Sequence, residues 1–270
     1  MKTMTENYWR IIQNDATQII ANSKDSQVSH CLIDSIYKTT ILTHASLPDA
    51  IASLLAAKLH SDEAPRQTLQ QLFKDVLINS PETHKIIYND LLAVVDRDPA
   101  ADGKMINPLL FFKGFHALQT HRIAHWLWAN HEKAVAFYLQ SKSSLVFSVD
   151  IHPAAKIGSG ILFDHATGIV IGETASIGNN VSMLHGVTLG GTGKHGGDRH
   201  PKIGDGVQIG AGAKILGNIR VGEGAKIAAE SVVLSDVPAH TTVAGVPARV
   251  VGKPKTKSPG KTMEEPDYEI

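Results

Sequence analysis

The chain carries an aspartate–histidine pair, Asp164-His165, within FDHATGIVIG, a stretch otherwise built mainly of aliphatic residues and glycine. A carboxylate close to an imidazole raises the basicity of the ring and fixes its tautomer, as a general base requires. Asp150, further upstream in VDIHP, is a second carboxylate that could serve His165. A single histidine is more often a solvated surface residue, so this interpretation depends on the elements that position these side chains.

A second polar group lies in the segment TGKHGGDRHP, which ends in Arg199-His200-Pro201. Arginine suits the bidentate binding of a carboxylate. Glycine clusters let the backbone approach a ligand and leave N–H groups free as donors. Such glycines lie directly before the segment and within it, at Gly190, Gly191, Gly193, Gly196 and Gly197.

The elements that must hold these residues follow a six-residue period. Apolar residues recur at Ile151, Ile157, Phe163, Ile169, Ala175, Val181 and Val187, and again at Ile203, Ile209, Ile215, Val221, Ile227 and Val233. A helix has 3.6 residues per turn and a strand alternates by two, so neither keeps this period. Hexads with glycine at the corners are typical of a parallel β-helix, in which three hexads form one coil. The interruption predicts an ejected loop at 193–202, which is a functional candidate because a stiff solenoid has no structural need for it.

This register gives His165 an unusual position and brings Asp150 near it. Asp150 precedes His165 by almost one coil of three hexads. Coils stacked at strand spacing would place Asp150 within roughly 5 Å of the level of His165, plus a short lateral offset. His165 occupies the third position of its hexad, where other hexads carry Ile171, Ile177, Met183 and Leu189.

The repeat also permits a metal-based alternative. Three imidazoles from neighbouring coils could bind zinc and leave one position open for water, as in the carbonic anhydrases built on a β-helix. Two of the candidates share one predicted loop, and no residues typical of the outer layer of a zinc site accompany them. The candidates are His165, His185, His195 and His200.

The half of the chain before residue 150 has a different composition and predicts helices. All three tryptophans lie there, whereas 20 of the 23 glycines lie between Gly158 and Gly252. Apolar residues at spacings of three and four predict six to eight helices. Asp49 and Ser80-Pro81 are candidate helix starts, and a helix over 83–96 should stop before Asp98-Pro99 because the residue before proline avoids the helical region.

The bulk composition narrows the classes of partner. The 26 basic and 26 acidic residues balance, so no charge excess points to nucleic acid or an anionic membrane. The single cysteine, Cys31, permits no intramolecular disulfide and fits a cytoplasmic protein. We see neither a signal-peptide pattern at the start nor an apolar run long enough to span a bilayer.

Taken together, these motifs resemble the bacterial serine O-acetyltransferases over about residues 10–253. The resemblance rests on DRDPA in the helical half and on VDIHPAAKIG, DHATGIVIGET, VTLGGTGK, GGDRHPKIG, IGAGAKILGN and AGVPARVVGKP. It implies an α+β chain with an all-helical N-terminal domain, 1–148, followed by a left-handed parallel β-helix of hexapeptide repeats, 149–253. A flexible tail, 254–270, is expected to follow, because its composition is polar and rich in proline and lysine.

The resemblance implies acetyl transfer from acetyl-CoA to the hydroxyl of serine, without a metal or a tightly bound cofactor. It assigns the general base to His165 and its partner carboxylate to Asp150. The residues that it implies for serine binding are Asp98, Pro99, Asp164, Arg199 and His200.

Coenzyme A in this family lies along the coils and is contacted mainly by backbone. By position, the coenzyme A contacts are expected at Gly191, Thr192, Ala211 and Ala229, with Lys226 and Arg249 near the phosphates. Ala211 and Ala229 have an equally good structural interpretation as small corner residues.

The resemblance also implies partners. It implies trimers whose sites lie between neighbouring β-helices, pairing of two trimers through the helical halves into a hexamer, and feedback inhibition by L-cysteine at the serine site. The tail ends in Ile270, which fits insertion into O-acetylserine sulfhydrylase. The leading alternative is a β-helix acetyltransferase acting on a sugar or another small alcohol, which would lack Asp98; a non-catalytic scaffold ranks below it.

Overall fold

The computed structural model describes residues 2–23, 26–192 and 196–263. Its first half is helical, with eight α-helices before residue 148 among the residues described, which confirms the expected number. The helices are α1 (Lys2–Asn22), α2 (Gln27–Tyr37), the π-turn η1 (Lys38–Leu42), α3 (Leu47–Leu59), α4 (Arg66–Asn79), α5 (Pro81–Arg97), the 3-10 turn η2 (Pro99–Ala101), α6 (Ile106–Phe111), α7 (Lys113–Ala129) and α8 (Lys133–Phe147).

Local sequence sets the helix ends that matter for the site. Helix α5 begins at Pro81 and ends at Arg97, directly before Asp98, as predicted. The expected start at Asp49 was placed too late in the chain. The side chain of Ser46 accepts the backbone N–H of Asp49, so α3 begins at Leu47 and Asp49 belongs to its first turn.

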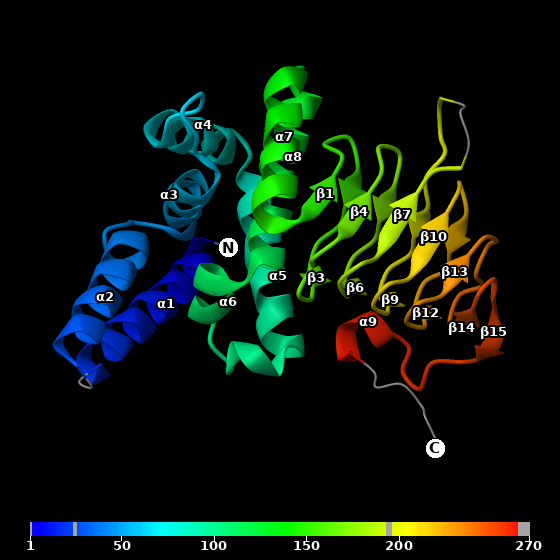
Figure 1. Ribbon diagram of the computed structural model, residues 1–270. Coiled ribbons are helices and arrows are strands. Elements are labelled where there is room, and N and C mark those ends of the chain that lie inside the picture. The colour runs from blue at the N-terminus through cyan, green and yellow to red at the C-terminus, as the bar shows by residue number, and fades with distance from the viewer. Residues whose placement is uncertain (1, 24–25, 193–195, 264–270) are drawn as a thin grey trace.

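The second half is a parallel β-helix with three sheets (Figure 1). One sheet contains β1 (Val149–Ile151), β4 (Ile169–Ile171), β7 (Thr188–Gly190), β10 (Lys214–Leu216) and β13 (Val232–Val233). A second contains β2 (Lys156–Ile157), β5 (Ser176–Ile177), β8 (Lys202–Ile203) and β11 (Arg220–Val221). The third contains β3 (Leu162–Phe163), β6 (Ser182–Met183), β9 (Gln208–Ile209), β12 (Lys226–Ile227), β14 (Thr242–Gly245) and the antiparallel β15 (Ala248–Gly252).

The uniform six-residue register is wrong in the first coil. Ile151 pairs with Ile171, and Ile171 in turn pairs with Leu189. The second step spans three regular hexads, whereas the first step is longer by two positions. Two extra residues therefore enter the corner between β3 and β4, and that corner contains His165. His165 is not equivalent to Ile171 or Leu189, which are core residues of their strands.

The ejected loop also has a measurable size. Ile177 pairs with Ile203, a step that is eight positions longer than the regular step from Ile171 to Leu189. The extra residues fall in the glycine-rich segment after β7, as the sequence predicts.

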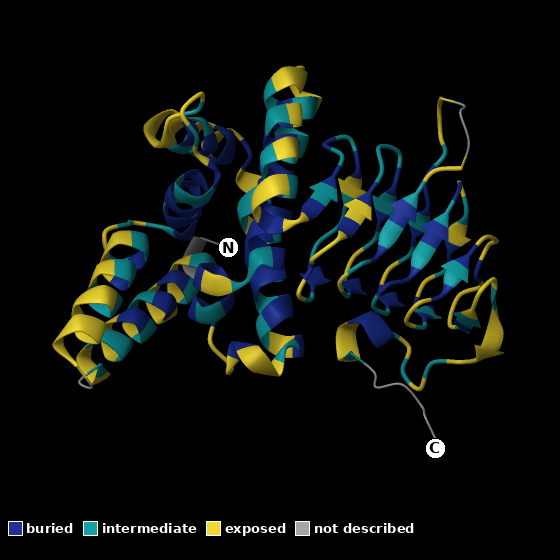
Figure 2. Ribbon diagram, in the orientation of Figure 1, coloured by how far each residue is buried: buried dark blue, intermediate teal, exposed yellow. Residues whose placement is uncertain are grey.

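A buried ion pair of the helical half is hydrogen-bonded to the first coil of the β-helix. Asp90 of α5 accepts the Nε–H of Arg122 of α7 at 2.7 Å, and both side chains are almost completely buried. The other oxygen of Asp90 accepts the N–H of Ile161, while Arg122 donates to the carbonyls of Ile157 and Gly158. Helices α5 and α7 are thereby fixed on the first coil, and the dark-blue residues of Figure 2 continue from these helices into the β-helix.

The tail departs from the expected flexibility over its described part. Residues 259–262 form a short helix, α9 (Pro259–Thr262), which packs against β6 and β9 beneath the β-helix in Figure 1. The N–H of Gly260 donates to the carbonyl of Gly206 at 2.8 Å. Residues 264–270, including Ile270, lie outside the described residues.

No helix in the described part of the chain is long and apolar enough to cross a bilayer.

Candidate active site

The two-residue insertion gives His165 its place at a strained corner. His165 and Ala166 have φ angles of 55° and 57°, a left-handed conformation that costs about 1–3 kcal/mol for a residue other than glycine. The corner is held by the N–H of Gly168, which donates to the carbonyl of Ser148 at 2.7 Å, and by the Lys113 amine bound to the Thr167 hydroxyl. Such strain persists where the surroundings hold it, and it concentrates at functional sites.

His165 projects from this corner with its side chain 79% exposed. Its ring lies edge-on to the ring of His185, one coil further on, with centroids 6.3 Å apart. Its Nε2 lies 3.8 Å from an oxygen of Asp164. The imidazole is therefore open to a substrate while a carboxylate and a second imidazole flank it.

Asp164 and Asp98 lie close enough for their charges to interact. Burial raises the pKa of Asp164, and the charge of Asp98 acts in the same direction, while His165 opposes both. Asp98 directly follows α5, and its carboxylate accepts a hydrogen bond from the N–H of Ala100 at 2.9 Å, with Pro99 in the turn between them. A cation held between two such carboxylates would relieve their mutual repulsion.

Asp150 lies on β1 with its side chain directed away from the β-helix core. Its neighbours Val149 and Ile151 are buried, whereas Asp150 is half-buried. One carboxylate oxygen accepts the amide of Gln140 at 2.7 Å. The corner that contains His165 is hydrogen-bonded through Gly168 to Ser148, two residues before Asp150. The two predicted catalytic residues therefore lie on either side of this hydrogen bond.

Arg199 and His200 lie on the other side of the β1 sheet, at the corner where its strands end. The two sides of this sheet, where its strands begin and where they end, are called its edges. The guanidinium of Arg199 forms an ion pair with Glu173 at 2.7 Å. The backbone N–H groups of Arg199 and His200 both donate to the hydroxyl of Thr174 at 3.0 Å. These contacts fasten the end of the ejected loop to the corner after β4.

His200 is buried and held as a neutral ring. The N–H of Thr174 donates to Nδ1 at 3.2 Å, so the ring proton is carried by Nε2. Burial lowers the pKa of His200, and the neighbouring Arg199 lowers it further. A side chain at Gly172 would lie 2.0 Å from the ring, so glycine is required beneath it.

The residues expected to contact coenzyme A fall into three places. Gly191 and Thr192 lie beside the Arg199–His200 edge, since a Cβ on Gly191 would lie 3.2 Å from His200. Ala211 and Ala229 continue the corner column of His165 and His185. This column is linked by N–H donation from Gly186 to Thr167, from Gly212 to His185 and from Glu230 to Ala211. Lys226 lies on β12, and Arg249 is exposed on β15.

The predicted site residues therefore divide between two edges of one sheet. Asp98, Asp164 and His165 lie at the edge where the strands begin, and Arg199 and His200 lie where they end. Residues 168–172 separate these edges by roughly 13 Å at the rise of an extended strand.

Sequence reasoning missed three side chains that contact the predicted ones. His185 was considered only as a zinc ligand, although its spacing from His165 equals the step between the paired residues Leu162 and Ser182 of the first coil. Glu173 and Gln140 carried no signal, because their contacts with Arg199 and Asp150 arise from tertiary packing.

The zinc alternative receives no geometric support from the described residues. They contain no group of three or more histidine, cysteine, aspartate or glutamate side chains placed to hold a metal ion. His165 and His185 come together, but His200 lies at the other edge and His195 lies outside the described residues.

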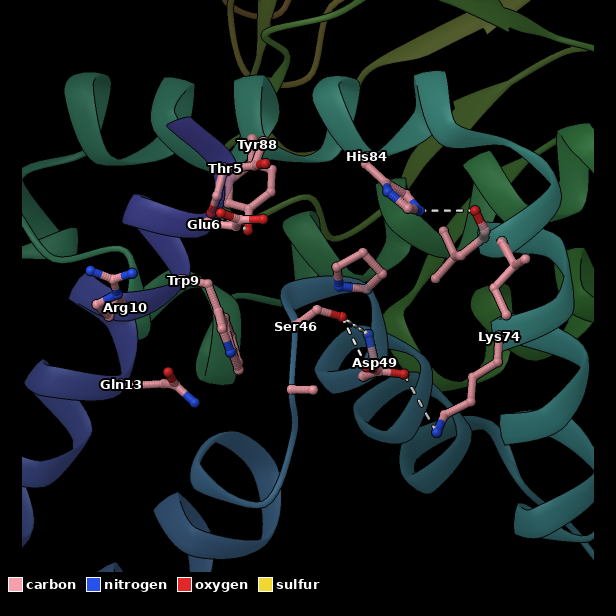
Figure 3. A pocket seen from close by; sticks show the side chains of 14 residues that line it. Thr5, Glu6, Trp9, Arg10, Gln13, Ser46, Asp49, Lys74, His84 and Tyr88 are labelled. Carbon is pink, nitrogen blue, oxygen red and sulfur yellow. Dashed lines mark hydrogen bonds and ion pairs between the residues drawn. The ribbon is translucent and has the colours of Figure 1, made fainter. Parts of the chain in front are cut away.

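Two cavities lie away from the predicted residues. One of about 540 Å³ lies in the helical half between α1, α3, α4 and α5, with Trp9 and Tyr88 in its wall (Figure 3). The other, of about 940 Å³, lies between α5, the corners of the β-helix and α9, and is bordered by Arg97 and Lys261.

Comparison with known proteins finds a matching family model in each half of the chain. The family model described as serine acetyltransferase, N-terminal, matches residues 9–120. The bacterial transferase hexapeptide (six repeats) model matches residues 200–235. The serine acetyltransferase of Escherichia coli K12 is 56% identical over 234 residues, which cover 87% of this chain and 85% of that protein.

Solved structures agree with the fold throughout. Serine acetyltransferase from Vibrio cholerae has a TM-score of 0.92 and 48% identity, covering 97% of this chain and 98% of that one. The enzyme from Brucella abortus, solved with coenzyme A, has a TM-score of 0.88 and 49% identity, covering 93% and 97%. A serine acetyltransferase solved with cysteine has a TM-score of 0.91 and 48% identity, covering 98% and 99%. This chain belongs to the serine acetyltransferase family.

Proposed function

We propose that this chain transfers the acetyl group of acetyl-CoA to the hydroxyl of L-serine, giving O-acetylserine and CoA. This reaction is the first step of cysteine biosynthesis from serine. The observation that carries the proposal is 56% identity to a serine acetyltransferase over 87% of the chain. The open imidazole of His165, with the carboxylate of Asp164 beside it, supplies chemistry of the required kind.

The serine hydroxyl is a poor nucleophile near neutral pH, so a base must remove its proton. His165 accepts this proton while the oxygen attacks the thioester carbonyl. The tetrahedral intermediate expels the CoA thiolate, which takes the proton back from His165. Asp150 orients the imidazole and stabilises its protonated form, and a base of this kind contributes ~10²–10⁴-fold.

The serine is held by charges of opposite sign. Asp98 and Asp164 bind its ammonium. The positive charge relieves the repulsion between the two carboxylates, which favours this binding. Arg199 binds the carboxylate together with the Nε2–H of His200, and Pro99 shapes the turn beside Asp98. L-cysteine, which has the same ammonium and carboxylate, acts as an inhibitor at this site.

One serine cannot reach both edges of the sheet within a single chain. The site is therefore completed by a neighbour, whose Arg199 and His200 face the His165 corner, and three chains close a trimer. Two trimers join through the helical halves into a hexamer. The helical half, 1–148, thus serves assembly and contributes Asp98, while 149–253 carries out catalysis.

Acetyl-CoA binds along the corner column above His165, past Ala211 and Ala229, where small residues leave the backbone accessible. Gly191 and Thr192 contact it from the other edge, and Lys226 and Arg249 lie near its phosphates. The tail carries Ile270 to O-acetylserine sulfhydrylase. We place the enzyme and this partner in the cytoplasm.

The proposal is tested by following CoA release from acetyl-CoA and serine in the presence of a chelator. His165→Ala is expected to lower kcat at least about a hundredfold, because the hydroxyl loses its base. His60→Ala, which changes an exposed histidine at the end of α3, is the control and should leave kcat unaltered. Near-normal turnover of His165→Ala would contradict the assignment of the base, and activity restored only by zinc would favour the metal alternative.

A further inference from the structure

A side chain outside the predicted site holds the carboxylate of Asp150. The amide of Gln140, on α8, donates to one oxygen of Asp150 at 2.7 Å. The two residues are close in the chain, because α8 ends at Phe147 and the backbone turns directly into β1. Among the described residues, the second oxygen of Asp150 has no protein donor.

Gln140 is itself fixed by the packing of α8. Helix α8 lies against α7 and β1, with Leu139 fully buried. Ser143, one turn further along the same face, donates to the carbonyl of Val149 at 3.3 Å. Gln140 also borders a cavity of only about 10 Å³, which it shares with His121. Its amide therefore has little freedom to leave Asp150.

The carboxylate that Gln140 contacts would otherwise have rotational freedom. Asp150 projects from β1 away from the core, and only half of it is covered. Binding one oxygen to a rigid donor fixes the plane of the carboxylate. The second oxygen then keeps a constant direction and can accept a hydrogen bond from an imidazole.

We infer that Gln140 is a positioning residue of the acetyl-transfer reaction, which fixes one oxygen of Asp150 so that the other can orient the imidazole of His165. The inference rests on the proposed function, in which Asp150 is the partner of the base. Gln140 touches neither substrate, so its effect falls on kcat rather than on the binding of serine.

The test replaces Gln140 with methionine, which keeps the length of the side chain and removes the donor. We expect Gln140→Met to lower kcat roughly ten- to hundredfold, the usual scale for a misplaced catalytic group, with both KM values within about twofold. Gln140→Glu, which sets a like charge against Asp150, should lower kcat at least as far. If the methionine variant fails to fold, the glutamate variant carries the test.

A matched control is available on the surface of α4. The amide of Gln71 donates to the carboxylate of Asp75 at 2.8 Å in an exposed pair of the same kind. Gln71→Met should leave kcat unchanged, which separates the effect on Asp150 from the general loss of an amide–carboxylate hydrogen bond.

The decisive measurement combines Gln140→Met with Asp150→Ala. If Gln140 acts through Asp150, the methionine change lowers kcat in the native background and has no further effect once Asp150 is alanine. An equal loss in both backgrounds would mean a merely structural role and would overturn the inference. A normal kcat for Gln140→Met beside a low kcat for Asp150→Ala would overturn the inference alone. A normal kcat for Asp150→Ala would overturn both it and the proposed role of Asp150.

Discussion

The imidazole of His165 is made available by its backbone. Two successive left-handed residues lift the ring out of the corner, where its side chain is 79% exposed and still lies beside Asp164. Three other histidines are buried instead of exposed. His116 and His121 are buried, and His200 is packed over Gly172. Burial lowers the pKa of these three rings, while the His165 ring is open to a substrate.

Buried histidines predict that acid destabilises the protein. Burial lowers the pKa of His116 to about 3, and it lowers the pKa of His121 well below the usual value. Between pH 6.5 and about 3, His116 is protonated in the unfolded chain and unprotonated in the folded chain. The free energy of unfolding should therefore fall by ~1.4 kcal/mol per pH unit for each such residue as the pH drops through this range. The contribution is fully present above the ordinary pKa of histidine.

Urea unfolding at pH 7, 6 and 5 measures this slope. The variant His116→Gln should reduce the slope by about one proton, or ~1.4 kcal/mol per pH unit. An identical slope in the variant and the native chain would show that His116 does not contribute to the acid effect.

At this scale the sequence predicted residue types better than residue contacts. The pairing of a carboxylate with an imidazole in DHATG, and the value of arginine in DRHP, follow from chemistry that is visible in the letters. The hydrogen-bond partners of Asp150 and Arg199 do not, because Gln140, which donates to Asp150, and Glu173, which accepts from Arg199, reach them only through the packing of separate elements.

At the scale of elements, the chemistry gathers where the coils depart from three regular hexads. The two-residue excess lies at the corner of His165, and the eight-residue excess lies before Arg199 and His200. The sequence predicted the second but not the first. Buried aliphatic residues recur two positions apart, as at Ile169 and Ile171, so stepping by six continued to meet core residues after the shift.

The ring of His200 packs directly against Gly172, so adding a side chain at Gly172 should displace the ring. A Cβ at this position would lie 2.0 Å from the ring, and the ring cannot stay where it is. Gly172→Ala should raise the KM for serine at least about tenfold through the displaced Nε2–H, with a loss of about 1–3 kcal/mol in stability from overpacking.

Steady-state kinetics with serine as the varied substrate checks this expectation. Gly252→Ala is the control, because a Cβ there meets nothing within 4 Å. An unchanged KM for Gly172→Ala would mean that His200 does not bind serine.

At the scale of the molecule, the helical half and the β-helix are joined by the pair of Asp90 and Arg122. Removing one member leaves the other charged and buried without a partner, which costs about 3–5 kcal/mol. Arg122→Met should therefore lower the midpoint of urea unfolding strongly. Lys104→Met, which breaks an exposed pair with Asp102, should have no measurable effect. Equal midpoints for the two variants would contradict the role of this ion pair in joining the halves.

The assembly of the proposed site also depends on the arrangement of the whole molecule. The two edges of the β1 sheet each carry some of the residues proposed to bind serine, and the sequence could not reveal this division because hexads fix the order of the strands but not the distances across a corner. The described part of the tail adds a further difference, since α9 is packed against β6 and β9, whereas the sequence predicts a flexible tail.

The most direct test of this account is complementation between two inactive chains. His165→Ala and Arg199→Ala are expected to be inactive alone, and their co-expression in equal amounts should form mixed trimers. About one site in four then combines an intact His165 corner with an intact Arg199 edge from a neighbour, so about a quarter of native activity should return. A mixture of His165→Ala with Asp98→Ala, which damages the same half of every site, should stay inactive. Activity of the first mixture no higher than that of its parents would contradict a site shared between chains.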